Sequence, residues 1–393
     1  MIQPSYRDTW AEISVDAIQH NTKQLKKYIG ESVNLMAVVK ADGYGHGAVH
    51  VAKAAIEAGA DYLAVAILDE AIELRESGIT EPILVMGYTP IRSIRQAIIA
   101  GVDLTVFTED VLDEVIFQAE HLQTTVSIHL KIDTGMTRIG VQTGEEALSL
   151  TKKATGSPNV FLKGIFTHFA IADNEDPSYT LLQFERFQSV LSFLEDHHLS
   201  IPLKHCCNSA GTMNFPEMHL DMVRVGIALY GLYPDASLKN HPISLCQAMT
   251  LKTKIAALKT VSETQPISYG CTYTPSSGSV IATLPIGYAD GLSRLLSNRG
   301  QFLLQEQKVP VVGRVCMDQT MIDVSSVSAC QHGDEVIIFG GNGEAFQSVD
   351  EIAHIMGTIN YEVVCLIGKR VPRIYLTAKN NTPENELQTL EFA

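Results

Sequence analysis

Reactive side chains follow several short apolar runs of the sequence, at the points where those runs end. Lys40 follows the run LMAVV and precedes the glycine-rich segment ADGYGHG. A lysine amine at such a position is a candidate nucleophile. Gly43, Gly45 and Gly47 would let backbone approach a ligand closely, and Tyr44 adds a hydroxyl group. The end of this first run is therefore a candidate site for covalent chemistry.

Later runs end in further polar residues. In chain order these are Lys131, Arg138, His168, Ser209 and Arg224. Taken singly, each is weak evidence for a site. Gathered at one place, the cationic groups and hydroxyls would suit a phosphate ligand and a carboxylate substrate. No two cysteines have the CxxC spacing of many metal sites, and we expect no metal.

The first 230 residues alternate short apolar runs with helical patterns. The runs lie at 35–39, 62–66, 83–86, 104–107, 126–132, 161–167, 203–207 and 221–225, and helical patterns include 15–29, 48–58 and 180–196. Eight such repeats predict an α/β fold, a (β/α)8 TIM-type barrel, whose active site lies at the C-terminal ends of the strands. A doubly wound open sheet is the alternative, but it normally carries GxGxxG after its first strand, and ADGYGHG does not fit that spacing.

After residue 234 the pattern changes to closely spaced strands. We predict strands at 249–258, 279–286, 308–316, 320–324, 334–339 and 370–376, with one helix at 348–357. The predicted organisation is an N-terminal segment (1–12), which is a candidate to join the C-terminal domain, a barrel (13–240), a mostly β domain (241–380) and a polar tail (381–393).

Composition limits the classes of partner. The 393 residues include 29 basic and 44 acidic side chains, a net charge of −15, without a long basic run. That balance argues against nucleic acid and anionic membranes as partners. No apolar stretch reaches the length of a membrane span, and the first ten residues lack the apolar core of a signal peptide. Seven cysteines, an odd number, indicate reduced thiols, so we expect a cytoplasmic protein.

The segment AVVKADGYGHGA (37–48) resembles the pyridoxal-phosphate lysine motif of the alanine racemase family. KIDTGMTRIG (131–140), FTHFA (166–170), NSAG (208–211), GIALYG (226–231), ISYGCTY (267–273), LPIGYADG (284–291), GRVCMDQ (313–319) and NYEV (360–363) follow in the family's order. The resemblance implies a pyridoxal 5′-phosphate-dependent isomerase that interconverts L- and D-alanine and supplies D-alanine for peptidoglycan. It also implies a homodimer with shared active sites.

The resemblance further implies which residues contact the cofactor. Lys40 would bind it covalently and act as one catalytic base, and Arg224 would face its pyridine nitrogen. The residues implied around its phosphate are Tyr44, Ser209, Gly226, Ile227 and Tyr361. One departure is visible: many relatives have proline where this chain has Val225, but the flanking arginine and glycine are kept.

The remaining implied roles concern the substrate. Tyr269 of the partner subunit would be the second base, supported by His168. Arg138 and the partner subunit's Met317 would bind the substrate carboxylate. Lys131 would be carbamylated and would hold Arg138, as in many relatives.

Three alternatives stay open at the level of sequence. A basic-amino-acid decarboxylase of the same architecture would be expected to place an acidic residue at the pyridine nitrogen, which Arg224 argues against. A racemase for serine or another small amino acid differs only in pocket volume, which gives weak discrimination. A cofactor-binding protein without turnover is the third, but single-domain barrels of that kind lack the second domain that carries Tyr269.

Overall fold

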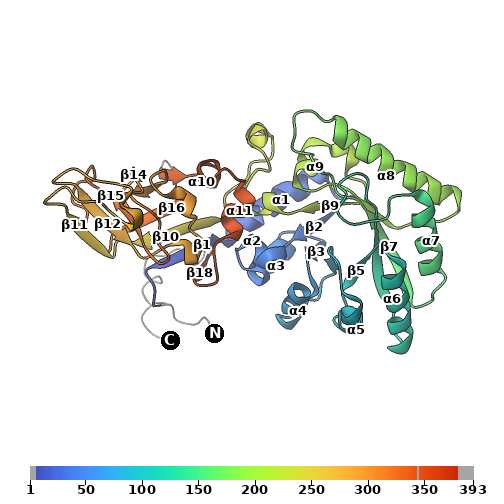
Figure 1. The fold of residues 1–393 in the computed structure, drawn as a ribbon. Coiled ribbons are helices and arrows are strands. Elements are labelled where there is room, and N and C mark those ends of the chain that lie inside the picture. The colour runs from blue at the N-terminus through green and yellow to red at the C-terminus, as the bar shows by residue number, and fades with distance from the viewer. Residues whose placement is uncertain (1–5, 343–344, 379–393) are drawn as a thin grey trace. The chain divides into compact units, whose positions relative to one another are not determined.

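The computed structural model describes residues 6–342 and 345–378, so the predicted polar tail 381–393 lies outside the described part. The chain forms two compact units, whose elements are labelled in Figure 1. The barrel unit comprises Ile18–Gly43 and Ala48–Cys246. The β unit comprises the N-terminal residues up to Ala17, the short segment Tyr44–Gly47 and the chain from Gln247 onward.

Eight parallel strands form the sheet of the barrel unit, as the apolar runs predict (Figure 1). They are β2 (Asn34–Val38), β3 (Tyr62–Val65), β4 (Ile83–Val85), β5 (Asp103–Val106), β6 (Val126–Lys131), β7 (Val160–Phe166), β8 (Leu203–His205) and β9 (Met222–Val225). The order is β8-β7-β6-β5-β4-β3-β2-β9. The backbone N–H groups of Asp221 and Arg224 donate to the carbonyls of Lys204 and Cys207 at 3.1 and 3.0 Å, which joins the two edges. The TIM-type barrel is confirmed.

Amphipathic helices connect these strands. They are α1 (Val15–Ile29), α3 (Ala48–Glu57), α4 (Leu68–Glu76), α5 (Ile94–Ile99), α6 (Glu109–His121), α7 (Gly144–Thr155), α8 (Ser178–Asp196) and α9 (Ser209–Asn214). In α1, Ile18, Leu25 and Ile29 are buried at the spacing of one helix face. Among the residues that the structure describes, no helix is long and apolar enough to cross a membrane.

The β unit is mostly β, as predicted, and contains two sheets. The larger has the order β14 (Gln307–Pro310), β13 (Gln301–Leu304), β16 (Glu335–Asn342), β10 (Met249–Lys254), β1 (Thr9–Ser14) and β18 (Arg373–Leu376), with β17 (Ala345–Gln347) on β16. The smaller consists of β11 (Ala257–Thr260), β12 (Val280–Leu284) and β15 (Thr320–Asp323). Two helices follow, α10 (Val349–Met356) and α11 (Asn360–Cys365).

Several predictions for the β unit were incomplete. The N-terminal segment supplies β1, which pairs with β10 antiparallel and β18 parallel, so it belongs to the β unit. The predicted strand 249–258 is two strands. The predicted strand 308–316 ends at Pro310, because the chain then turns to β15, where Val311 forms an isolated bridge with Ile322 and the Val312 N–H donates to the Met321 carbonyl at 2.9 Å. Single-turn 3-10 helices also occur, at Ile91–Ser93, Pro216–Met218, Ile227–Tyr230, Ala236–Asn240, Tyr269–Cys271, Tyr288–Asp290 and Arg294–Leu296.

Candidate active site

Lys40 lies two residues after the end of β2, at the start of a left-handed turn. The short element α2 (Lys40–Tyr44) has φ and ψ of 53° and 49° at Ala41 and of 52° and 49° at Asp42. For residues other than glycine, this conformation costs roughly 1–2 kcal/mol each. Such strain persists where surrounding contacts hold it, and it is common at functional sites. The backbone after Lys40 is therefore fixed in an unusual conformation.

Two carboxylates hold this turn within the barrel unit. Glu70, in the first turn of α4, accepts from the backbone N–H of Ala41 at 2.6 Å and from that of Ala66, just after β3, at 2.8 Å. Asp42 accepts from the backbone N–H of Ala48 at 2.9 Å. Glu70 thus ties the ends of two neighbouring strands together. Sequence reasoning missed this residue, because nothing distinguishes it from other glutamates in a helix's first turn.

The glycines after Lys40 serve a different purpose from the one predicted. A Cβ at Gly45 would lie 2.4 Å from the carbonyl oxygen of Val364, and one at Gly47 would overlap the hydroxyl of Tyr375. Both glycines have positive φ, +80° and +90°. Within the β unit, their missing side chains make room for the chain itself. The expectation that these two glycines admit a ligand is therefore corrected.

Positive charge gathers at the carboxyl ends of the barrel strands. Lys131, the last residue of β6, is 4% exposed, and its Nζ lies 4.3 Å from the centre of the Phe166 ring. Burial, then Arg224 and Arg138, hold the pKa of Lys131 well below its usual value, while Asp133 opposes them. An ammonium group is costly to bury among other cations. This end of the barrel therefore favours an anion.

Arg224, on β9, lies at the centre of this charge. It is 3% exposed and donates to the backbone carbonyls of Thr167 and Cys206 at 2.8 and 2.9 Å. It also donates to Nδ1 of His205 at 3.0 Å and Nδ1 of His168 at 3.2 Å. Burial lowers the pKa of Arg224 to about 10, so the guanidinium stays charged at neutral pH. No carboxylate is among these four partners.

His168 is neutral in this surrounding. Burial, followed by Arg224 and other cations, keeps its pKa well below 6.5. Nδ1 lies 3.2 Å from an Arg224 nitrogen that can only donate, which favours Nδ1 as an acceptor and places the ring proton on Nε2. His168 therefore offers a hydrogen-bond donor rather than a charge.

Ser209 and the backbone after β9 form a second cluster in the barrel unit. Ser209 is the first residue of α9, and Asn208 caps that helix by accepting from the N–H of Gly211 at 2.8 Å. The Ser209 hydroxyl oxygen accepts from the N–H groups of Gly226 and Ala228 at 3.0 and 3.4 Å. Its own hydrogen can then be donated to a ligand oxygen.

Ile227, between Gly226 and Ala228, is 1% exposed. Val225, where many relatives have proline, is the last residue of β9 and pairs with Ala37 of β2. A β-branched residue suits a strand position. Valine instead of proline at position 225 therefore keeps the strand, with Arg224 and Gly226 on either side.

The β unit holds four predicted site residues, Tyr44, Tyr269, Met317 and Tyr361, whereas Arg138 lies in the barrel unit. The rings of Tyr44 and Tyr361 lie 6.2 Å apart, centre to centre. Tyr269 is 72% exposed and Met317 is 53% exposed. Ser268, beside Tyr269, donates from its hydroxyl to the carbonyl of Arg314 at 2.7 Å, which ties the ISYGCTY and GRVCMDQ segments together.

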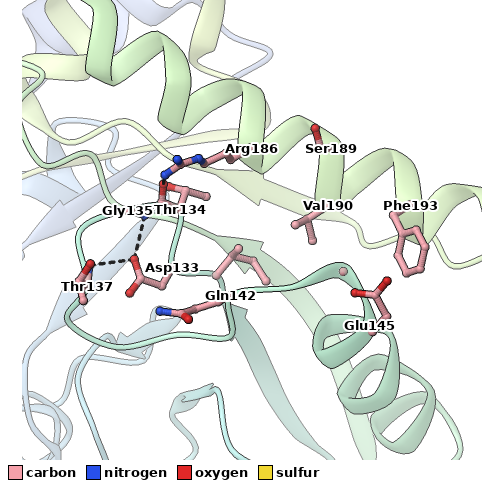
Figure 2. A pocket seen from close by; sticks show the side chains of 12 residues that line it. Asp133, Thr134, Gly135, Thr137, Gln142, Glu145, Arg186, Ser189, Val190 and Phe193 are labelled. Carbon is pink, nitrogen blue, oxygen red and sulfur yellow. Dashed lines mark hydrogen bonds between the residues drawn. The ribbon is translucent and has the colours of Figure 1, made fainter.

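A cavity of about 550 Å³ in the barrel unit is lined by residues of the segment 132–145 and of α8 (Figure 2). Asp133, Gln142 and Arg186 are among the side chains that line it. The Asp133 carboxylate accepts from the N–H groups of Gly135 and Thr137, each at 3.0 Å. The resemblance assigns no role to these lining residues. The Asp133 carboxylate holds the turn that precedes Arg138 through these two hydrogen bonds.

The fold and site together define a class of protein. It consists of barrel enzymes that have a lysine after a barrel strand, a cluster of cationic side chains suited to bind an anion, and a second, mostly β domain. Residues 13–234 match the family described as alanine racemase, N-terminal domain, and residues 248–375 match alanine racemase, C-terminal domain. The chain belongs to the alanine racemase family.

Individual relatives agree over nearly the whole chain. Alanine racemase 2 of Oceanobacillus iheyensis is 57% identical over 376 residues, which cover 96% of this chain and 95% of the relative. The crystal structure of alanine racemase from Bacillus anthracis with bound L-Ala-P has a TM-score of 0.91 at 42% identity and covers 96% of this chain and 97% of that one. Alanine racemase from Streptomyces lavendulae, which produces D-cycloserine, also has a TM-score of 0.91, at 37% identity, covering 95% and 98% of the two chains.

Proposed function

We propose that this chain is a pyridoxal 5′-phosphate-dependent racemase that interconverts L- and D-alanine, with Lys40 and the partner subunit's Tyr269 as its two bases. Family membership makes it an enzyme of the amino-acid racemase class. The observation that carries the proposal is the surplus of positive charge around Arg224 and Lys131, which lies on the same barrel face as the lysine. An anionic cofactor and a carboxylate substrate would balance it.

The residues present fit this cofactor by the chemistry of their donors. Lys40 supplies an amine able to bond to an aldehyde. Ser209 offers a hydroxyl hydrogen, because its oxygen already accepts from two backbone N–H groups. With Gly226 and Ile227, and with Tyr44 and Tyr361 from the β unit, it would surround a phosphate.

Bound there, the cofactor would draw electrons from the substrate's Cα–H bond and so acidify it. Racemisation then needs one base on each face of Cα. Lys40 would take or return the proton on one face, and Tyr269 on the other. Tyr269 is largely exposed in the single chain, which supports its use by a second subunit in a homodimer.

His168 would assist Tyr269 by donating a hydrogen bond from Nε2. A phenol has a pKa near 10, and a donor to its oxygen favours the phenolate. Since His168 is neutral, this assistance comes from the hydrogen bond, while Arg224 provides the positive field.

Arg224 would also restrict the chemistry. A guanidinium facing the pyridine nitrogen disfavours protonation of that nitrogen. Arg224 would in this way limit how strongly the bound cofactor acidifies the substrate's Cα–H bond. We infer that side reactions such as transamination are suppressed.

Arg138 and the partner subunit's Met317 would bind the substrate carboxylate. Lys131, buried beside two arginines, would be stabilised by carbamylation, since CO2 converts its amine into an anion that pairs with Arg138. D-Alanine for peptidoglycan would be the product. The free state of all seven cysteines supports a cytoplasmic location.

The predicted limits 13–240 and 241–380 would divide β1 (Thr9–Ser14), so we propose instead that the mostly β domain takes the N-terminal segment up to Ala17 and the chain from Gln247. The pairing of β1 with β10 supports the assignment of the N-terminal segment.

A chiral assay of purified protein tests the function. L-Alanine, L-serine and L-lysine are supplied with and without added pyridoxal 5′-phosphate, and CO2 release from L-lysine is measured in parallel. We expect cofactor-dependent formation of D-alanine and no CO2, with Lys40→Ala as the inactive control. CO2 release would favour the decarboxylase, faster serine conversion would favour a serine racemase, and cofactor binding without turnover would favour a carrier.

A further inference from the structure

A row of polar side chains crosses the interior of the barrel unit, behind Arg224. Nδ1 of His205, on β8, lies 3.0 Å from the guanidinium of Arg224. Nε2 of His205 lies 2.9 Å from Nδ1 of His129, on β6. Nε2 of His129 lies 3.7 Å from the carboxylate of Asp103, on β5, and Lys163, on β7, donates to that carboxylate at 2.7 Å. Both histidines are fully buried.

The order of donors and acceptors along this row is fixed by its ends. A guanidinium only donates, so Nδ1 of His205 must accept and its proton must lie on Nε2. That N–H then donates to Nδ1 of His129, whose own proton must lie on Nε2. This N–H faces the Asp103 carboxylate, which only accepts. At 3.7 Å the contact is electrostatic rather than a direct hydrogen bond.

The charge states agree with this order. Burial keeps the pKa of His205 well below 6.5, and burial also lowers that of His129, so both rings are neutral. Burial alone would raise the pKa of Asp103, but His129 and Lys163 outweigh it and lower that pKa. Asp103 therefore stays a carboxylate.

The strand that neighbours His129 leaves room for its ring. A Cβ at Gly164, on β7, would lie 2.2 Å from Nδ1 of His129. The pairing of β6 with β7 is also irregular between Ile128 and His129. Buried polar groups are costly unless they are paired. His129 has a partner in His205, and the missing side chain at Gly164 leaves space for its ring, so the packing here accommodates a buried histidine pair.

We infer that Asp103 is a positioning residue: Arg224 sets the proton order at one end of the row, and the Asp103 carboxylate, which faces Nε2 of His129, stabilises the same order at the other end. The expected effect of Asp103 on racemisation rests on the proposed function, whereas the order of protons does not. A ring of the opposite tautomer at His205 would set N–H against N–H at Arg224. The guanidinium would lose one of its four partners and would shift from its place.

The order of protons is measured by ¹⁵N NMR of histidine-labelled protein, without and with added pyridoxal 5′-phosphate. His129→Gln and His205→Gln assign the signals. We expect both rings to be neutral Nε2–H tautomers at neutral pH. An Nδ1–H tautomer or a charged ring at either position would overturn the inference. This measurement on the intact chain needs no active enzyme.

Asp103→Asn tests the cause. An amide has only one oxygen, so it cannot accept from both His129 and Lys163 as a carboxylate can. We therefore expect a mixture of His129 tautomers. We also expect roughly a tenfold loss of kcat/KM, since replacing residues that act through another residue typically lowers activity roughly 10- to 100-fold. Lys163→Met is the matched control, since it removes the carboxylate's other partner and should leave both tautomers unchanged.

Unchanged tautomers in Asp103→Asn would overturn the inference, as would a full rate with mixed tautomers. If the wild-type protein shows the expected tautomers but has no racemase activity, the proton order is supported and only the proposed function is contradicted.

Discussion

Replacing Arg138 by alanine separates substrate binding from catalysis. Arg138 is exposed, on the loop between β6 and α7. Among the described residues no carboxylate lies within ion-pair distance of it, so the fold loses little when its side chain is removed. Its charge instead acts on the mouth of the barrel, where it contributes to the low pKa values of Lys131 and His168.

The size of the effect follows from the lost interaction. A hydrogen bond to a charged group contributes about 1.5–3 kcal/mol. Since about 1.4 kcal/mol corresponds to a factor of ten, Arg138→Ala should raise KM roughly tenfold to a hundredfold. The change in kcat should be smaller, because a carboxylate clamp acts alike in the ground state and the transition state.

The assay follows both directions with L- and D-alanine. The two enantiomers have equal free energy, so kcat/KM must be equal in both directions for every variant, which checks the data internally. Arg138→Lys is the control and should retain part of the affinity, because it keeps the charge without the planar fork. A loss confined to kcat would refute the clamp and indicate a transition-state role.

Three further predictions concern the rest of the fold. In a crystal structure, Lys131 should show planar density beyond Nζ from carbamylation, and a bare ammonium group at good resolution would contradict it. Gly45→Ala should lower the free energy of unfolding by about 3 kcal/mol or more, because the new Cβ would meet the Val364 carbonyl. Gly78→Ala is the control: Gly78 has φ +85° and open space around it, so the loss should be only about 1–2 kcal/mol. Equal melting temperatures of the two variants would count against this packing. Burial keeps the native pKa of His205 well below 6.5, so the unfolded chain binds a proton that the native chain does not, and stability should fall as the pH drops below about 6.5, by up to about 1.4 kcal/mol per pH unit. Urea midpoints that do not fall, or a slope unchanged in His205→Gln, would contradict it.

Sequence patterns predicted the barrel well, because each strand is a short apolar run followed by a helix with its own apolar face. Helix α1 has the predicted limits, 15–29, since Ile18, Leu25 and Ile29 recur at helical spacing. The β unit was harder to predict. β1 pairs with strands far along the chain, and Val312 is buried without being in a strand, so local pattern alone misleads there.

Sequence reasoning selects candidate site residues where chemistry and strand ends coincide, as at Lys40 and Arg224, and their roles stay predictions. The support behind it was not. His129 and Lys163 lie inside runs that have the pattern of ordinary strands, and their meeting at Asp103 depends on the pairing of β5, β6 and β7 and on its register. Gly45 was singled out for ligand approach, but the atom that requires a glycine there, the carbonyl oxygen of Val364, is more than three hundred residues away in sequence.

A subunit-mixing experiment tests the central proposal most directly. Lys40→Ala and Tyr269→Ala chains, each inactive alone, are mixed and allowed to exchange subunits. If each site combines Lys40 of one chain with Tyr269 of the other, a mixed dimer has one intact site and one doubly defective site. With about half of the dimers mixed, activity should return to roughly a quarter of wild type. If one chain supplies both residues, every site keeps a defect and no activity returns, which would contradict the shared site.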